Sequence, residues 1–261
     1  MKTGMTLAEL AAELDRQKTA KRDFVAPTPE LEMMVTDDVR LRVNGHGSFA
    51  VRDLAHRQIA TRVGIPQKYY DKMLKEAPAL MADNVNHWFK AAPEARMVRT
   101  LDGEARAFLS GRYRRLDNNG VAEAALQGLS DVPGLSVEST ALTETKLYIK
   151  AVTARIMGEV KPGDVVQAGI VISNSEVGLG MVKVEPLIYR LVCRNVLISP
   201  DAALRRYHVG RGVETEFAEE LFTTDTLKLD DAAFFAKVRD LVRASFSEEG
   251  FAKILEQFKV A

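Results

Sequence analysis

The stretch Arg96-Met-Val-Arg-Thr-Leu-Asp-Gly-Glu-Ala-Arg-Ala-Phe-Leu109 decides the fold class. Its two arms are rich in residues suited to extended structure, and they flank Asp102-Gly103. Asp-Gly is a turn pair that tolerates the positive φ angles of a type I′ turn. The stretch therefore predicts a β-hairpin, and the segments on either side of it indicate what surrounds that hairpin.

Four more extended segments follow the hairpin, and one short helix precedes them. Asn118 or Asn119 is suited to cap that helix, which we expect to run through Leu126. The expected strands are Leu135–Thr140, Lys146–Val152, Asp164–Ser173 and Met181–Cys193. Together with the hairpin they predict a largely antiparallel sheet of about six strands with one inserted helix, because the connections are short.

Helical periodicity brackets this sheet on both sides. Apolar residues recur at helical spacing over 51–91, which predicts a helical N-terminal layer, and again over 230–258, which predicts a helical C-terminal tail. Residues 31–50 contain only short extended pieces. The predicted class is α+β.

The first residues form a separate amphipathic segment. Thr6 and Glu9 make a capping box for a helix over 6–22, and Pro27-Thr-Pro29 is typical of a linker. This helix packs either on the main domain or on a neighbouring subunit. The expected division is therefore an N-terminal helix with its linker over 1–29, a core domain over 30–213 and a helical segment over 214–261.

Composition excludes several classes of protein. The chain has 261 residues, of which 46% are hydrophobic, and 36 basic side chains balance 36 acidic ones. Such a chain is expected to fold into a globular protein with no global attraction to nucleic acid or membrane. Cys193, the sole cysteine, excludes an internal disulfide, and no apolar signal segment or membrane span is seen. We expect a cytoplasmic protein.

Enzymatic signatures are absent from the sequence. No phosphate loop, dinucleotide-binding glycine pattern, zinc-protease motif or nucleophile elbow occurs, and the four histidines are scattered. One acidic arrangement, Asp131 with Glu144 and Lys146, suits a metal-dependent nuclease, which stays open as an alternative. The main expectation is a protein without catalytic activity, metal or cofactor.

The arginines are unevenly distributed. Residues 96–115 contain six arginines against two carboxylates, 183–211 form a second basic segment, and 214–231 are acidic. Tyrosines interleave with the basic residues, and Lys146, Tyr148 and Lys150 alternate with apolar neighbours, so they are expected to share a face. Cations neutralise phosphates while aromatic rings stack on bases. The predicted nucleic-acid-binding residues are Arg99, Arg106, Arg112, Tyr113, Arg114, Arg115, Lys146, Tyr148, Lys150, Arg205, Arg206 and Arg211.

Two further interpretations concern charge pairing. The arginines are equally suited to pair with the acidic segment 214–231, inside the chain or across a subunit contact, as in a structural or protein-interaction protein. The glycine-containing loop Asn174–Gly180 is expected to be a hairpin connection. Its carboxylate, Glu176, is a candidate to cap a helix or to pair with an arginine.

Several spaced motifs between residues 35 and 225 resemble a known family. They are Val98-Arg-Thr-Leu-Asp-Gly103, Arg106-Ala-Phe-Leu-Ser-Gly-Arg-Tyr-Arg-Arg-Leu-Asp-Asn118, Gly169-Ile-Val-Ile-Ser-Asn-Ser-Glu-Val-Gly178, Val184-Glu-Pro-Leu-Ile-Tyr-Arg-Leu-Val-Cys-Arg-Asn195 and His208-Val-Gly-Arg211. The chain is similar in these motifs to the phage/plasmid-like proteins, a family of unknown function, although Val196 stands where that family usually has glycine. The resemblance implies a mobile-element setting, where replication, repair and recombination proteins are common.

A more distant similarity is to single-strand annealing proteins, which have a small sheet backed by a helix and assemble into rings with a basic groove. This similarity is one of fold plan only, and a fold does not by itself establish a function. The predicted function is a non-enzymatic, homo-oligomeric nucleic-acid-binding protein of a phage or plasmid. Single-stranded DNA is the favoured partner, in annealing or recombination.

Overall fold

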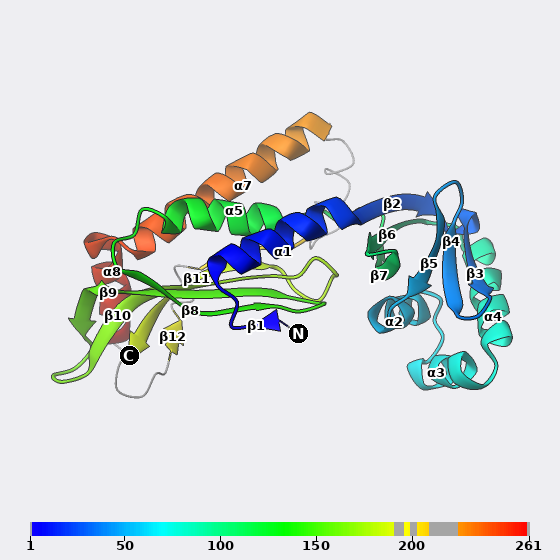
Figure 1. The fold of residues 1–261 in the computed structure, drawn as a ribbon, viewed down its shortest axis with the longest axis horizontal. Coiled ribbons are helices and arrows are strands. Elements are labelled where there is room, and N and C mark those ends of the chain that lie inside the picture. The colour runs from blue at the N-terminus through cyan, green and yellow to red at the C-terminus, as the bar shows by residue number, and fades with distance from the viewer. Residues whose placement is uncertain (1, 191–195, 199–202, 209–223, 260–261) are drawn as a thin grey trace. The chain divides into compact units, whose positions relative to one another are not determined.

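The computed structural model describes residues 2–190, 196–198, 203–208 and 224–259 (Figure 1). The chain is α+β, as predicted, but it forms two compact units, each with its own sheet. Unit 1 comprises Met1–Asp15 and Arg115–Ala261, and unit 2 comprises Arg16–Arg114. The strands thus form two sheets and not one sheet of about six strands, and the two compact units divide the chain at other residues than the expected 30 and 213. The hairpin over residues 96–109 was expected to pair with the strands that follow it. In the structure it pairs instead with strands from the N-terminal third of the chain.

Unit 2 is a six-stranded sheet with three helices. Its strands are β2 (Lys21–Pro27), β3 (Leu31–Val35), β4 (Val39–Val43), β5 (Gly47–Val51), β6 (Ala95–Leu101) and β7 (Glu104–Ser110). Its helices are α2 (Asp53–Arg62), α3 (Gln67–Glu76) and α4 (Pro78–Ala91), with a short 3-10 helix, η1, over Thr28–Glu30. The strand order is β2-β6-β7-β5-β4-β3, and only β5 and β7 run parallel among these pairs.

The hairpin β6–β7 is formed as predicted. Asp102 and Gly103 make the turn with φ angles of 54° and 79°. On the far side of β6, Asp23 of β2 pairs in register with Arg99. The Arg99 guanidinium is fully buried and binds both carboxylate oxygens of Asp23, at 3.0 Å each. This pair joins β2 to β6 as an edge strand of the sheet, so the expected linker at Pro27 is the end of a strand.

The free edge of β3 is closed by a side chain. Asn86 of α4 accepts a hydrogen bond from the Met33 amide at 2.7 Å and donates one to the Met33 carbonyl at 2.9 Å. The Asn86 amide thus takes the place that a neighbouring strand would occupy. Such protection matters because an open strand edge is a template for pairing with another chain.

Unit 1 is a seven-stranded sheet covered on one face by helices. Its strands are β1 (Lys2–Thr3), β8 (Leu135–Leu142), β9 (Leu147–Glu159), β10 (Val165–Asn174), β11 (Val182–Arg190), β12 (Val196–Ile198) and β13 (Leu204–Arg206). Its helices are α5 (Asn118–Leu129), α7 (Thr224–Ser245) and α8 (Glu248–Lys259), with the first part of α1 (Leu7–Ala20). The order is β1-β8-β9-β10-β11-β12, and β13 also pairs with β11.

The first part of α1 is capped and packed in unit 1. The Thr6 amide donates to the Glu9 carboxylate at 2.8 Å, and the Glu9 amide donates to the Thr6 hydroxyl at 3.2 Å, which is the predicted capping box. The bonds that the Thr6 amide and the Thr6 hydroxyl donate to the Glu9 carboxylate lower its pKa. Leu10 and Leu14 are buried in the core of unit 1. Of the two expected packing partners of this helix, the structure shows its own domain, through Leu10 and Leu14.

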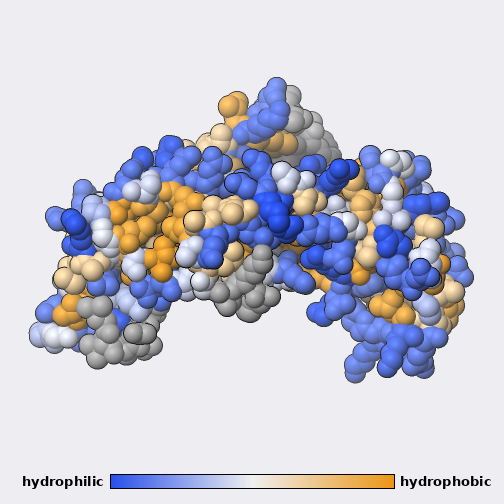
Figure 2. All heavy atoms as spheres, viewed as in Figure 1, coloured by the Kyte–Doolittle hydropathy of each residue, from blue (hydrophilic) through white to orange (hydrophobic). Residues whose placement is uncertain are grey.

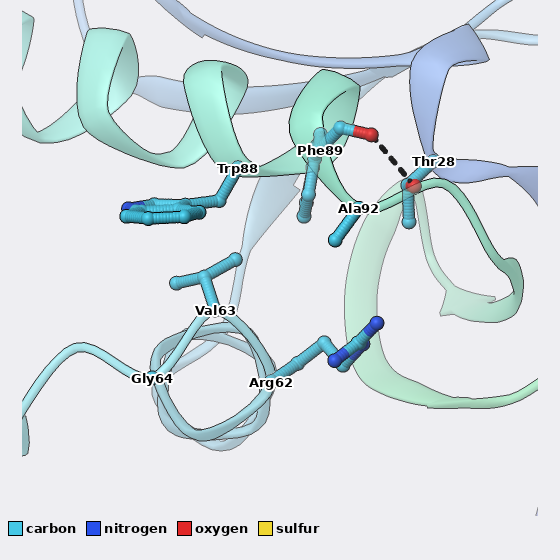
Figure 3. Close-up of a pocket in the computed structure, with 7 residues that line it drawn as sticks. All are labelled: Thr28, Arg62, Val63, Gly64, Trp88, Phe89 and Ala92. Atoms are coloured by element: carbon cyan, nitrogen blue, oxygen red, sulfur yellow. Dashed lines mark hydrogen bonds between the residues drawn. The ribbon is translucent and has the colours of Figure 1, made fainter.

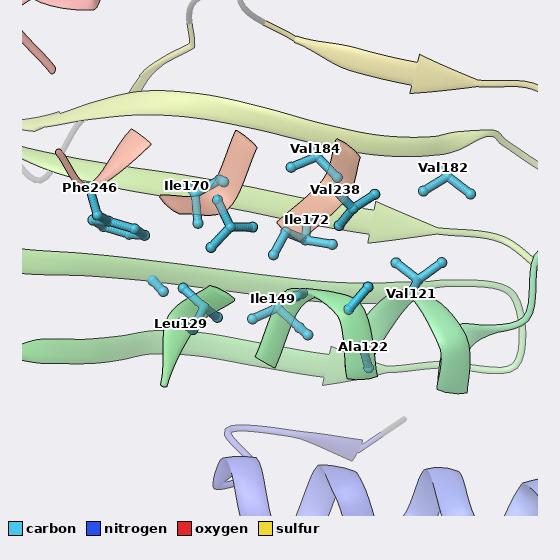
Figure 4. Close-up of a cluster of buried hydrophobic side chains, with 14 of the residues drawn as sticks. Val121, Ala122, Leu129, Ile149, Ile170, Ile172, Val182, Val184, Val238 and Phe246 are labelled. Carbon is cyan, nitrogen blue, oxygen red and sulfur yellow. The ribbon is translucent and has the colours of Figure 1, made fainter. Parts of the chain in front are cut away.

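The two faces of the unit 1 sheet differ. On the inner face, isoleucines and valines of β9, β10 and β11 pack against α5 and α7 (Figure 4). Hydrophobic side chains also reach the surface where α5 meets the sheet (Figure 2). On the outer face, the described residues form a smaller apolar cluster drawn from strands alone, namely Val152, Val171, Leu187 and Tyr189 with Tyr148 beside them.

Gly169 of β10 is required by the outer cluster. A Cβ at this position would lie 2.6 Å from the Leu187 side chain and 2.9 Å from the Ala151 carbonyl. We therefore expect Gly169→Ala to lower the free energy of unfolding of unit 1 by about 1–3 kcal/mol, a typical cost of overpacking. Thermal unfolding followed by circular dichroism measures this. Gly180→Ala is the control, because its Cβ would meet only Ser175 at an ordinary 3.5 Å; equal losses in both variants would contradict the packing argument.

His56 makes the stability of unit 2 pH-dependent. Burial lowers its pKa from 6.5 to about 4, and its Nδ1 lies 2.8 Å from the Tyr70 hydroxyl. The unfolded chain binds a proton at His56 more readily than the folded chain does. The free energy of unfolding should therefore be greatest above pH 6.5. It should fall by up to about 3 kcal/mol as the pH drops toward 4.

The measurement is urea unfolding followed by the fluorescence of Trp88, the sole tryptophan, which lies in unit 2. His56→Gln should flatten the pH profile between those values. If the free energy of unfolding of His56→Gln fell by the same amount over this pH range, the pH dependence would come from other groups.

Candidate nucleic-acid interface

A row of polar side chains crosses the outer face of the unit 1 sheet near one end. Tyr148 of β9 pairs with Ser173 of β10, Ser173 with Lys183 of β11, and Lys183 with Arg205 of β13. Directly opposed residues point to the same face, so these four side chains form one line, here called the cationic row. With adjacent strands about 4.8 Å apart, the row spans roughly 14 Å of backbone.

Two lysines flank this row. Lys150 lies two residues along β9, with its ammonium 4.4 Å from the centre of the Tyr189 ring. It shares a face with Tyr148, as the alternation predicted. Lys146 is exposed in the turn before β9. The row and its flanks therefore carry cations from three strands and a turn.

The carboxylates at this end of the sheet are fewer than the cations. Glu185 binds Arg205 at 3.0 Å, Glu138 accepts a hydrogen bond from the Tyr189 hydroxyl at 3.4 Å, and Glu144 is exposed in the turn beside Lys146. Tyr148 is half-buried against the outer apolar cluster, and this burial raises the pKa of its hydroxyl. Its ring is thus held in place while part of it stays accessible.

A buried polar network fixes the loops at the same end of the sheet. Asn174, which follows Ser173, donates to the Leu116 carbonyl at 2.8 Å and to Asn118 Oδ1 at 2.9 Å. Its own Oδ1 lies 3.0 Å from Nε2 of His208. Three segments distant in sequence are joined in this way. Asn118, Asn174 and His208 are each at most 5% exposed.

Glu176 completes the network at the start of α5. Its carboxylate accepts a hydrogen bond from the Asn118 amide at 2.6 Å and is only 2% exposed. Negative charge is favourable at a helix N-terminus, where amides lack intrahelical partners. The expected cap by the side chain of Asn118 or Asn119 is replaced by this carboxylate, and the capping role predicted for Glu176 is confirmed.

Several predicted binding residues are placed elsewhere. Arg99 is buried against Asp23, Arg106 is 5% exposed and Tyr113 is 6% exposed, so these side chains are parts of the interior. Arg206 points to the helical face, pairs with Asp230 and Asp231 of α7, and lies 4.9 Å from the centre of the Phe234 ring. It thus makes the pairing with the acidic segment that was the competing interpretation. Arg112 and Arg115 are exposed, Arg114 is half-buried, and Arg211 lies outside the described residues.

The three residues of the nuclease alternative do not meet. Asp131 lies before β8 and pairs with Arg243 at 3.0 Å, whereas Glu144 and Lys146 lie beyond the other end of β8. Eight extended residues separate the two ends by roughly 26 Å. Within the described ranges, no cluster of three metal-ligating side chains occurs. The predicted nuclease site is therefore not assembled.

Sequence reasoning missed Lys183 and the network residues Asn174 and His208. Lys183 alternates with the buried Val182 and Val184, so strand periodicity was the signal that could have placed it on the outer face. For Asn174 and His208 the sequence carries no pairing signal, because their contact depends on how distant strands line up.

Comparisons of the chain with protein-family models, with curated proteins and with solved structures gave no match. None of the helices described here is both long enough and apolar enough to cross a membrane.

The Glu176 cap gives a direct test of the network. We expect Glu176→Ala to lower the free energy of unfolding of unit 1 by about 1–3 kcal/mol, because the buried Asn118 amide is left without its acceptor. Hydrogen exchange of the first turn of α5 should accelerate in the same variant. Glu144→Ala, which removes an exposed carboxylate from a turn of unit 1, is the matched control and should leave both measurements unchanged. Unaltered exchange at Asn118 in the Glu176 variant would show that the cap is dispensable.

Proposed function

We propose that unit 1 binds a single-stranded nucleic acid across the outer face of its sheet, without catalysing a reaction on it. The observation that carries the proposal is the cationic row, in which Tyr148, Ser173, Lys183 and Arg205 lie side by side opposite the helical face. Sheet faces that combine aromatic rings with cations are a known way to hold unpaired bases and phosphates.

The cations, the aromatic ring and a flanking lysine of the row have distinct parts in this proposal. Phosphates are contacted by Lys146, Lys183 and Arg205. The ion pair with Glu185 orients the Arg205 guanidinium. Tyr148 offers a ring for a base, and its packing against the outer cluster limits the entropy cost when the base stacks. Contacts to phosphates and stacking on bases carry no sequence information, so the binding is expected to be insensitive to sequence.

A second candidate is a protein-interaction role without nucleic acid. It is favoured by the pairs Arg206–Asp230 and Arg205–Glu185, in which two predicted phosphate contacts are engaged with carboxylates of the same chain. Under this alternative the basic residues organise the unit itself, and nucleic acid should not bind at low salt.

Homo-oligomerisation remains part of the proposal. Deletion of residues 1–29 is not a suitable test of it, because that deletion removes Leu10 and Leu14 from the core and β2 from its sheet. Light scattering of the intact chain, with and without a bound strand, measures the assembly directly. A monomer in both conditions would remove the oligomer from the proposal.

The functional test uses the triple variant Lys146→Ala, Lys183→Ala, Arg205→Ala and a fluorescent poly-deoxythymidine strand. Binding should weaken, and the slope of log affinity against log salt should fall by roughly 0.7 for each phosphate that is no longer neutralised, about 2 in all. Tyr148→Ala should instead cost about 1–3 kcal/mol in binding free energy with little change in slope.

The matched control removes the same charge from the helical side. Lys237, Arg243 and Lys253 are exposed on α7 and α8, and their triple alanine variant should keep the wild-type salt slope. Equally weakened strand binding in both triple variants would show that binding depends on the net charge of the chain and not on the cationic row. Absence of strand binding by the wild-type chain at low salt would refute the proposal and favour the protein-interaction role.

A further inference from the structure

Unit 2 contains a pocket that the proposed function does not use. It has a volume of about 240 Å³ and lies between the end of α2, the end of α4 and the start of η1 (Figure 3). Its lining residues are Thr28, Arg62, Val63, Gly64, Trp88, Phe89 and Ala92. All of them belong to unit 2, so the pocket is built within one compact unit.

The walls of the pocket are held rigidly. Thr28 donates to the Phe89 carbonyl at 2.8 Å and accepts a hydrogen bond from the Glu94 amide at 3.2 Å. The Phe89 ring is buried and stacks on Phe108, with ring centres 5.6 Å apart. At the rim, Gly64 has a φ of +69° and no atom near its Cβ position, so the backbone there favours a residue without a side chain.

Trp88 presents an aromatic ring to this pocket. Its indole N–H donates to Asn84 at 3.1 Å, and its ring meets His87 edge-on with centres 5.1 Å apart. These contacts fix the orientation of a side chain that is 44% exposed. In Figure 3 the indole and Val63 face one another across the pocket. An exposed indole whose polar atom is already satisfied is suited to stack on a planar ring.

The opposite side of the pocket carries an excess of positive charge. Arg62 and Arg96 both pair with Glu94, so two guanidinium groups share one carboxylate. Burial and the neighbouring Arg96 lower the pKa of Arg62. Among the described residues, the terminal amino groups of Arg62 donate no hydrogen bond, and its contact with Glu94 is made through Nε. An anionic group would relieve this repulsion and accept those donors.

We propose that this pocket binds a mononucleotide unit, with the base against the indole face of Trp88 and the phosphate at Arg62. The ring surface and the cation lie in the same small cavity, which matches a ligand that joins a planar aromatic group to an anion. The nucleotide comes either free or as one residue of a single strand. The site lies in unit 2, so it is tested separately from the proposed strand-binding face of unit 1.

Trp88 is the sole tryptophan, so its fluorescence reports on this site in the intact chain. The probes are deoxyadenosine monophosphate, deoxyadenosine, inorganic phosphate and a short deoxyadenosine oligonucleotide. The monophosphate should give saturable quenching, and the nucleoside should bind roughly tenfold more weakly because it lacks the charge-assisted contact. Phosphate alone should not quench. Tighter binding of the oligonucleotide than of the monophosphate would identify a strand as the source.

The variants assign the effect to the two named side chains. Arg62→Gln should weaken monophosphate binding about tenfold and leave nucleoside binding nearly unchanged. Arg57→Gln removes an exposed arginine of the same helix outside the pocket and should change neither. Calorimetry replaces fluorescence for Trp88→Ala, which should abolish monophosphate binding, whereas Leu80→Ala, which alters an exposed apolar residue of the same helix, should retain it. Circular dichroism verifies that each variant is folded.

The result that overturns the proposal is quenching that rises linearly without saturation, equal for monophosphate and nucleoside, because that pattern is collisional. Monophosphate binding by Arg62→Gln with the affinity of the wild-type chain would also overturn it. The Lys146, Lys183, Arg205 triple variant should keep wild-type monophosphate quenching. Loss of quenching in that variant would place the nucleotide in unit 1 and not in this pocket.

Discussion

The buried side-chain amide of Asn174 links distant segments of unit 1 by hydrogen bonds. It contacts a carbonyl and an amide oxygen at the start of α5 and an imidazole nitrogen from the segment after β13, and Asn174 is 1% exposed. Buried polar groups are costly when they lack partners, so each of these contacts requires the others. Because Asn174 Oδ1 accepts a hydrogen bond, the facing Nε2 of His208 carries the proton. The strand end, the start of α5 and the segment after β13 are therefore held in one arrangement.

This constraint also sets the position of the proposed interface. Ser173 and Arg205 of the cationic row lie within three residues of Asn174 and His208, respectively. Their side chains point to the outer face because strand residues alternate, while the network residues point inward beneath α5. The same short segments thus carry a structural residue on one face and a candidate binding residue on the other. Rigid placement of binding groups reduces the entropy cost of holding a ligand.

The parts of this fold that follow from local rules could be predicted. The Asp102-Gly103 turn and the Thr6–Glu9 capping box depend on neighbouring residues only. The shared face of Tyr148 and Lys150 follows from the strand period of two. The partners of the β6–β7 hairpin could not be predicted, because the pairing with β2 joins residues 68 to 80 positions apart in the sequence. The same limit applies to Arg99: a count of charges along the chain shows that it is basic, but not that Asp23 lies opposite it.

Charge density along a sequence and charge on a surface are therefore different quantities. The segment 96–115 is the most arginine-rich part of the chain. Within it, however, Arg99 and Arg106 are buried, and Arg96 forms an ion pair with Glu94. A buried guanidinium needs a carboxylate or equivalent partner, since desolvation of an isolated charge is very unfavourable. Strand residues that alternate with the core have no such requirement, and Lys150 and Lys183 keep part of their surface in solvent. In this chain of zero net charge, the spacing of basic residues relative to the apolar face thus indicates which of them reach the surface better than their number does.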